Sequence, residues 1–288
     1  MSSKWDGKSK GNKFGYLFFV YTIKFLGLKA TYLFLRLVTF YYYLFSPSRK
    51  HLLDFYKNAL AYSFKESKKL ARKNYYIFGQ SLVDRFAFLM GKHKEYTHNS
   101  IGGDNLKNLV KSGKGAILMS AHVGNWELAG NFLKGNYNAK VNVLMYQADA
   151  EKLTELFNTV TGGVSFNIIA IKNDLSHIIK IHSALSKNEF VCLHADRNMP
   201  GAKTLEADFF GKKAKFPQGP FQMASKFNAP VCFVYNVKKT NFHYQLSCSK
   251  PIEGNFSAEE ILKKYINTFE EKTKENPTQW FNFYNFFN

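Results

Sequence analysis

The sequence predicts an α/β fold with a mainly parallel central sheet flanked by helices, preceded by an N-terminal apolar, membrane-associated helical segment. From Gly113 onward, short apolar runs alternate with stretches of helical periodicity, an order typical of parallel sheets joined by helical crossovers. Before that, residues 17–45 form one long apolar stretch. With 288 residues, 45% of them hydrophobic, the chain can bury a sizeable core, and intrinsic disorder is excluded.

The apolar stretch defines a predicted N-terminal segment, residues 1–46. Lys24, Lys29 and Arg36 interrupt it, and each would be costly at the centre of a bilayer. The stretch is too long for a signal-peptide core and ends without a small-residue cleavage site. We expect an interfacial or partly inserted helix, or a helical hairpin broken near Gly27. The alternative is a buried first helix. The segment opens with basic residues: Lys4, Lys8, Lys10 and Lys13.

Residues 47–288 are predicted to form a single globular domain. Pro47 ends the first segment, and the pattern from His51 to Met90 is helical. The apolar runs that predict strands are Ala116–Met119, Val141–Tyr146, Phe166–Ile169, Phe190–Leu193 and Val231–Val237. The intervening helical patterns are Trp126–Leu133, Ala150–Val160, Leu175–Leu185 and Phe221–Phe227, and a last helix is predicted at about 258–274.

Charge and composition limit the partners. The formal charge is +19, and aromatic residues make up 17% of the chain, which together favour an anionic membrane surface. Nucleic acid would also suit a basic, aromatic protein, but the basic residues are spread along the chain and no nucleic-acid motif is found. The three cysteines include no CxxC pair and are interpreted as free thiols; we predict no metal site and a monomer.

One segment carries candidate chemistry: residues 119–130, Met-Ser-Ala-His-Val-Gly-Asn-Trp-Glu-Leu-Ala-Gly. His122 follows an apolar strand, at the edge where open α/β sheets place their ligands. Gly124 and Asn125 favour a turn, which would bring Glu127, in the first helical turn, back to His122. A hydrogen bond from the His122 ring to Glu127 would fix the tautomer and make His122 a general base. Alone, this spacing also fits an unremarkable loop histidine beside a helix-start glutamate.

Several blocks in the same order resemble one family. His122 to Glu127 resembles the His-x4-Glu block of the bacterial lipid A late acyltransferases, within the lysophospholipid acyltransferase superfamily. Residues 194–197 (His-Ala-Asp-Arg) match a second block, and 208–211 (Asp-Phe-Phe-Gly) with 216–220 (Phe-Pro-Gln-Gly-Pro) a third. Residues 277–280 (Pro-Thr-Gln-Trp) are a weaker fourth match.

The resemblance implies transfer of a fatty acyl chain from acyl carrier protein or coenzyme A to a hydroxyl of a lipid, such as a lipid A precursor. It implies His122 as the base, Glu127 as its orienter, no cofactor, and a place at the bacterial inner membrane with the active site on the cytoplasmic side. An aminolipid, a polyene lipid or a lysophospholipid remains an alternative acceptor. The residues expected to bind substrate are Asn125, Asp196, Arg197, Gly211 and Gly219. Donors to the tetrahedral oxyanion are expected from the backbone amides of residues 122–125 or from Arg197.

Overall fold

The computed structural model describes residues 13–137, 139–160, 166–172 and 174–287, so the basic residues Lys4, Lys8 and Lys10 lie outside the described part. The helices are α1 Lys13–Phe45, α2 Arg49–Asn58, α3 Phe64–Leu89, α4 Gly103–Lys111, α5 Trp126–Tyr137, α6 Gln147–Val160, α7 Ser176–Ser186, α8 Gln218–Lys226 and α9 Ala258–Glu275, with short 3₁₀ turns η1 Lys92–Glu95 and η2 Pro277–Gln279. The strands are β1 Thr97–Ile101, β2 Ala116–Ser120, β3 Val141–Tyr146, β4 Asn167–Ile171, β5 Phe190–His194, β6 Thr204–Phe209, β7 Lys212–Pro217, β8 Val231–Thr240 and β9 His243–Cys248.

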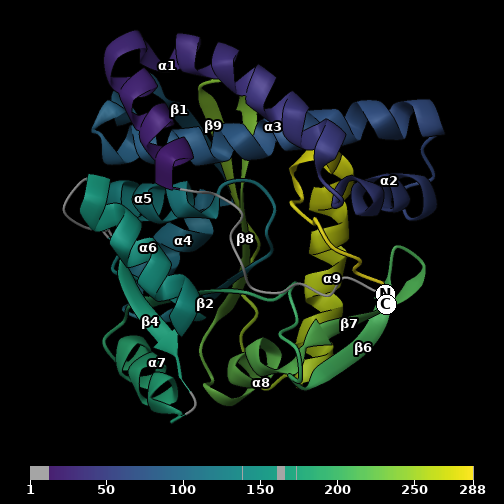
Figure 1. The fold of residues 1–288 in the computed structure, drawn as a ribbon. Coiled ribbons are helices and arrows are strands. Elements are labelled where there is room, and N and C mark those ends of the chain that lie inside the picture. The colour runs from purple at the N-terminus through teal and green to yellow at the C-terminus, as the bar shows by residue number, and fades with distance from the viewer. Residues whose placement is uncertain (1–12, 138, 161–165, 173, 288) are drawn as a thin grey trace.

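A seven-stranded sheet forms the centre of the molecule (Figure 1), with the order β1-β9-β8-β2-β5-β3-β4. Its neighbouring strands pair in parallel except β8 and β9, which form an antiparallel hairpin. The prediction of a mainly parallel sheet flanked by helices is therefore confirmed, and all five predicted strands are present. β1 and β9 extend the sheet beyond that prediction.

The central strands are apolar throughout because helices cover both faces of the sheet. All five residues of β2 are buried, and its residues alternate between two cores. Ile117 and Met119 pack with α7, α8 and α9 on one face, while Ala116 and Leu118 pack with α4 and α5 on the other.

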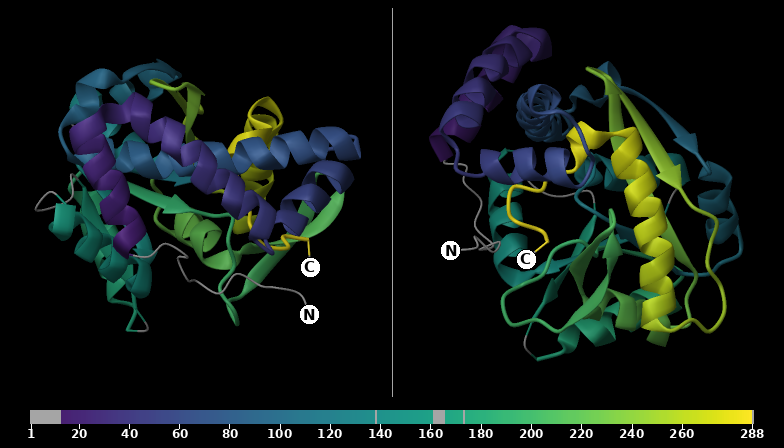
Figure 2. Two further views of the ribbon diagram at one scale, coloured as in Figure 1. Left: turned by 45° about the horizontal axis from the view of Figure 1, so that its top comes forward. Right: turned by 90° about the vertical axis from the view of Figure 1, so that its right-hand side faces the viewer.

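The N-terminal helices lie across the end of the sheet where β2 and β5 terminate. Figure 1 shows α3 running over that end, and Figure 2 shows α1 as the outer helix above it. A Ser63–Glu66 capping box starts α3. Helix α1 is broken at Gly27, whose φ of 76° and ψ of 173° suit only glycine, so the predicted break is found.

Helix α1 has two different faces. Its inner face shares a core with α3 and α5, in which Ile23 and Leu28 are buried. Its outer face leaves large apolar side chains exposed, including Phe25 and Leu37, each 70% exposed. By length and composition Leu17–Phe45 could cross a membrane. The division into a 1–46 segment and a 47–288 domain stays a prediction.

Strands β6 and β7 form a separate two-stranded hairpin, which is not among the predicted strands. Phe210 and Gly211 connect them with φ values of 51° and 70°, and positive φ at both positions is the mark of a type I′ turn. The hairpin is anchored by Phe209, which is fully buried and stacks on Phe269 of α9 with ring centroids 4.7 Å apart.

Candidate active site

A tight turn presents His122 at the carboxyl end of β2. Gly124 makes this turn possible, because its φ is 73° and a Cβ at this position would lie 2.1 Å from the Asn236 carbonyl oxygen. Asn125 then starts α5: its side-chain oxygen accepts a hydrogen bond of 3.3 Å from the Leu128 amide. The predicted strand–turn–helix arrangement is therefore present.

The partner of His122 is Asp196, which follows the neighbouring strand β5. His122 Nδ1 lies 2.7 Å from Asp196 Oδ1, and the His122 backbone amide donates to Oδ2 at 3.1 Å. β2 and β5 pair in parallel with Ser120 opposite His194, so both residues emerge at the same sheet edge. The carboxylate is 1% exposed and the imidazole 21% exposed. The bond to Nδ1 leaves Nε2 as the nitrogen that can meet a substrate.

The prediction that His122 forms a hydrogen bond with Glu127 is wrong. Glu127 instead accepts from Arg85 of α3 at 2.7 Å, in an ion pair whose side chains are 13% and 10% exposed. As the second residue of α5, Glu127 faces the helix α3 that lies over the sheet end, whereas Asp196 reaches His122 across adjacent strands. Burial raises the pKa of Glu127, and the charge of Arg85 opposes this shift.

Electrostatics set the protonation states of the His122–Asp196 pair. Burial lowers the pKa of the His122 ring, the Arg197 charge lowers it further, and Asp196 opposes both. Burial by itself raises the pKa of Asp196, but His122 and Arg197 together outweigh it and hold that pKa well below the usual range of a carboxyl group. At neutral pH the pair is therefore a neutral imidazole beside an ionised carboxylate, the state that a general base requires.

A second histidine lies against the first. The His194 ring stacks on the His122 ring with centroids 4.3 Å apart, and Trp126 meets His194 edge-on at 5.2 Å. Burial and the neighbouring His122 hold the pKa of His194 well below its ordinary value, so this ring is neutral. The ligand atoms of His122, His194 and Asp196 lie within 4.8 Å of one another, a spacing that could also accommodate a metal ion.

The segment 279–284 closes the site from a third part of the chain. Trp280 Nε1 donates to Asp196 Oδ2 at 3.2 Å, and the Phe281 amide donates to the His122 carbonyl at 3.0 Å. Arg197 donates to the Phe281 carbonyl at 3.0 Å, and the Tyr284 hydroxyl to the Asp196 carbonyl at 3.2 Å. The weak sequence match at 277–280 thus contains a residue, Trp280, that binds the partner of His122.

Beside this pair lies a narrow apolar pocket between α5 and the sheet. Trp126 and His194 lie at its polar end, near His122. Gly130 of α5 widens it, because a Cβ there would lie only 3.2 Å from the Phe166 ring. The apolar part of its lining includes Leu118, Ala129, Gly130, Leu133, Val141, Val143, Phe166, Cys192 and Val234.

The structure brings together only some of the predicted substrate-binding residues. Asp196 and Arg197 lie at His122, whereas Gly211 is at the tip of the β6–β7 hairpin and Gly219 is in the first turn of α8. Helix α8 precedes β8 near the end of the sheet where the strands begin, opposite to His122 (Figure 1). Substrate binding by Gly211 and Gly219 stays a prediction.

The backbone amides of the turn are already occupied. His122 N donates to Asp196, Val123 N to the Ala121 carbonyl, Gly124 N to the Gln279 carbonyl and Asn125 N to the Asn236 carbonyl. The expectation that these amides serve as oxyanion donors is therefore wrong. The side chain of Asn125 was expected to bind substrate. The residue is only 4% exposed, and its side-chain amide donates a hydrogen bond of 3.0 Å to the Ser81 carbonyl.

Comparison with known proteins decides the family. The model of the bacterial lipid A biosynthesis acyltransferases matches residues 14–288. The chain belongs to this family. It is also similar to the phosphatidylinositol mannoside acyltransferase of Mycolicibacterium smegmatis (28% identity over 129 residues) and to that of Mycobacterium tuberculosis H37Rv (30% over 133 residues). These matches cover 44% and 46% of this chain and 42% of each relative. The predicted membership of the lipid A acyltransferase family is confirmed.

Proposed function

We propose that the protein transfers a fatty acyl chain from a thioester, carried by acyl carrier protein or coenzyme A, to a hydroxyl of a lipid acceptor. The observation that carries the proposal is the His122–Asp196 pair, which lies at the carboxyl end of two adjacent parallel strands and beside an apolar pocket. Open α/β sheets bind ligands at this edge. The family and its relatives, both named as lipid acyltransferases, support the same reaction class.

In the proposed reaction, His122 acts as general base. Asp196 holds the Nδ1–H tautomer, so the Nε2 lone pair takes the proton from the acceptor hydroxyl while the hydroxyl oxygen attacks the thioester carbonyl carbon. The tetrahedral intermediate collapses, the carbon–sulfur bond breaks, and the imidazolium returns its proton to the leaving thiolate. No nucleophilic side chain takes part. The positive charge of Arg197 lies close enough to lower the pKa of His122, and we assign Arg197 to stabilising the negative charge of the oxyanion or of a substrate phosphate.

Glu127 has a positioning role in this proposal. Through Arg85 it ties α5, which begins in the catalytic turn, to α3. Of the two residues of the His-x4-Glu block, His122 exchanges the proton and Glu127 positions the helix that follows the catalytic turn.

The apolar pocket is assigned to the acyl chain, which must widen it on entering because the free space in it is small. Its polar end adjoins His122 and its lining is apolar, so a thioester carbonyl at the base would direct the hydrocarbon chain between α5 and the sheet. Burying each methylene group there contributes about 0.8 kcal/mol, enough for an apolar chain to be preferred over water.

The acceptor is proposed to be a glycolipid at a membrane surface. The family is named for lipid A biosynthesis and the two relatives for phosphatidylinositol mannoside, so both names point to a glycolipid that carries hydroxyl groups. The exposed apolar face of α1 suits a bilayer interface, and the chain's net charge of +19 suits anionic head groups. We place the protein at the bacterial inner membrane, with its active site on the cytoplasmic side where acyl thioesters are found.

The test is expression of the wild type, His122→Ala and the control His93→Ala in a bacterial host, followed by mass spectrometry of the extracted lipids. His93 is exposed and lies in η1. A lipid that gains the mass of one acyl chain with the wild type and His93→Ala, but not with His122→Ala, supports the proposal and identifies the acceptor. The same new lipid with His122→Ala would refute His122 as the base.

A further inference from the structure

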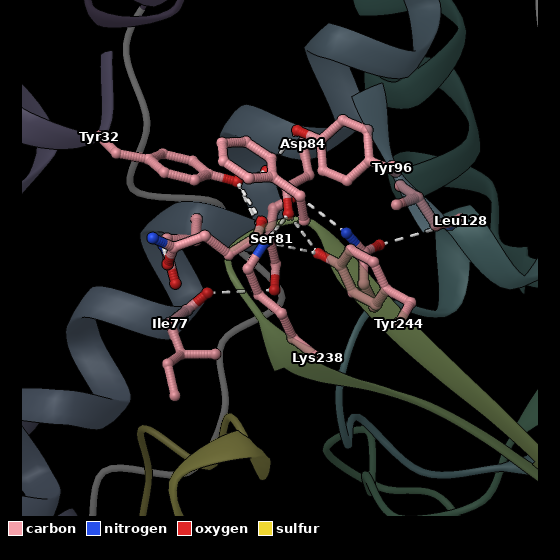
Figure 3. Close-up of polar contacts among 12 residues, drawn as sticks. Tyr32, Ile77, Ser81, Asp84, Tyr96, Leu128, Lys238 and Tyr244 are labelled. Carbon is pink, nitrogen blue, oxygen red and sulfur yellow. Dashed lines mark hydrogen bonds and ion pairs between the residues drawn. The ribbon is translucent and has the colours of Figure 1, made fainter. Parts of the chain in front are cut away.

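A buried ion pair lies away from His122, beneath helix α1. Figure 3 shows Asp84 of α3 surrounded by Tyr32 of α1, Tyr96, Lys238 of β8 and Tyr244 of β9. The Asp84 carboxylate accepts from the hydroxyls of Tyr32 and Tyr244 and from the Lys238 ammonium, and from the Tyr96 hydroxyl at 2.8 Å. We call these five residues the Asp84 cluster.

The Asp84 cluster is closed to solvent. The Asp84 side chain is fully buried and that of Lys238 is 3% exposed. Burial lowers the pKa of Lys238, and Asp84 opposes this shift. Buried ion pairs seldom stabilise a protein more than apolar residues of the same size, and their best-supported use is to specify one geometry. The cluster therefore calls for an explanation beyond stability.

One side of the Asp84 cluster reaches the catalytic turn. The Asn125 side-chain amide donates at 3.0 Å to the carbonyl of Ser81, which lies three residues before Asp84 on α3. Asn125 in turn starts α5 and lies three residues after His122.

A second path runs along β8. The Gln279 side chain accepts from the Lys238 amide and donates to the Lys238 carbonyl, both at 2.8 Å. The Gln279 carbonyl accepts from Gly124 N at 2.8 Å, and Asn236, two residues before Lys238, exchanges hydrogen bonds with Asn125. The strand that carries Lys238 thus contacts the turn that presents His122 through these hydrogen bonds.

The opposite side of the Asp84 cluster is α1. The Tyr32 hydroxyl bonds to Asp84, accepts from Lys238 Nζ at 3.0 Å and lies 3.1 Å from the Asn241 carbonyl in the turn between β8 and β9. Tyr32 is 4% exposed, although the neighbouring Leu33 is 62% exposed. Helix α1 therefore turns an apolar face outward and a single phenol inward, onto the charge pair.

We propose that Tyr32, Asp84, Lys238 and Tyr244 are positioning residues that hold the His122 turn through Asn125 and Gln279, so that α1 is part of the catalytic scaffold as well as a membrane-facing helix. The inference rests on the proposed role of His122. It assigns to α1 a contribution to turnover that is separate from membrane attachment. Removing the Tyr32 hydroxyl leaves the apolar face of α1 unchanged but takes a donor from Asp84 and an acceptor from Lys238.

The experiment compares Tyr32→Phe with Tyr41→Phe, the same change at a tyrosine of α1 that is 59% exposed. Three quantities are measured at a temperature at which both variants are folded by circular dichroism: co-sedimentation with anionic phospholipid vesicles, steady-state thiol release from an acyl thioester with a glycolipid acceptor, and amide hydrogen exchange of the peptide covering 122–128. We expect Tyr32→Phe to lower kcat at least about tenfold with KM unchanged within a factor of about two, since positioning acts on the transition state.

Vesicle binding should be the same in both variants, and exchange in 122–128 should rise about tenfold in Tyr32→Phe alone, with the α9 peptide as internal reference. Unchanged exchange, unchanged kcat, or a loss of activity that follows vesicle dissociation would each overturn the inference. If the wild type releases no thiol, the proposed function fails, and the exchange measurement alone decides whether α1 holds the turn. Should Tyr32→Phe not fold, Tyr244→Phe tests the other end of the same path by the same measurements.

Discussion

Replacing Asp196 by asparagine tests the catalytic geometry most directly. Two of the three donors to this carboxylate, His122 N at 3.1 Å and Trp280 Nε1 at 3.2 Å, bind the same oxygen, Oδ2. An asparagine must therefore place its single oxygen there, which puts its NH₂ group against His122 Nδ1. That nitrogen must then accept a hydrogen bond, so the ring proton moves to Nε2, the nitrogen that should take the substrate proton.

The wrong tautomer should cost about 10³- to 10⁴-fold in kcat, by analogy with the Asp→Asn change in a Ser-His-Asp triad. This corresponds to about 4–5.5 kcal/mol in the activation barrier. The assay is thiol release from the acyl thioester with acyl-lipid product followed by mass spectrometry. The control is Asp208→Asn, because Asp208 is a 68% exposed aspartate on β6. If folded Asp196→Asn keeps more than about one tenth of the wild-type kcat, a barrier change below about 1.4 kcal/mol, Asp196 does not set the tautomer.

Three further predictions concern pH, stability and substrate length. Because the pKa of His122 is lowered and the base must be unprotonated, kcat/KM should rise with pH and level off at an inflection below the ordinary histidine value of 6.5; an inflection above pH 7 would contradict this assignment. Glu127→Gln leaves Arg85 buried without its carboxylate and should lower the free energy of unfolding by about 3 kcal/mol in urea titration, whereas an unchanged midpoint would show that the pair is dispensable. Gly130→Val narrows the apolar pocket and should shift the preferred acyl chain to a shorter length in competition assays, unlike Gly135→Val on the same helix, where a Cβ meets nothing within 4 Å; equal profiles would place the chain elsewhere.

Much of the fold follows from local sequence. The strands that pack on both faces are continuous apolar runs, so β2, β3, β5 and β8 could be recognised one by one. β1 could not, because its sequence, Thr-His-Asn-Ser-Ile, is polar and all five residues are exposed at the sheet edge. Its place in the sheet depends on pairing with β9, more than 140 residues later, and no local pattern reports such a pairing.

The site shows the same limit. The sequence alone predicted that His122 follows an apolar strand and that a turn comes after it. The choice of Glu127 as its partner relied on proximity in sequence, whereas the observed partner, Asp196, becomes a neighbour only because β5 lies next to β2. Asp196 also follows an apolar strand, so the available signal was the shared placement of both residues at strand ends. Knowing that β5 lies next to β2 would have identified Asp196 as the partner of His122, but strand order is a property of the whole sheet and not of a local pattern.

The closure of the site by segment 279–284 has a consequence for folding. His122 and Trp280 are bridged by Asp196, so the three belong to parts of the chain separated by more than 70 residues at each step. Contacts this distant in sequence form slowly, because a large loop must close before any of them contributes. Helices and the local β6–β7 hairpin can form earlier. We therefore expect catalytic competence to be acquired among the last events of folding, after most of the secondary structure is in place.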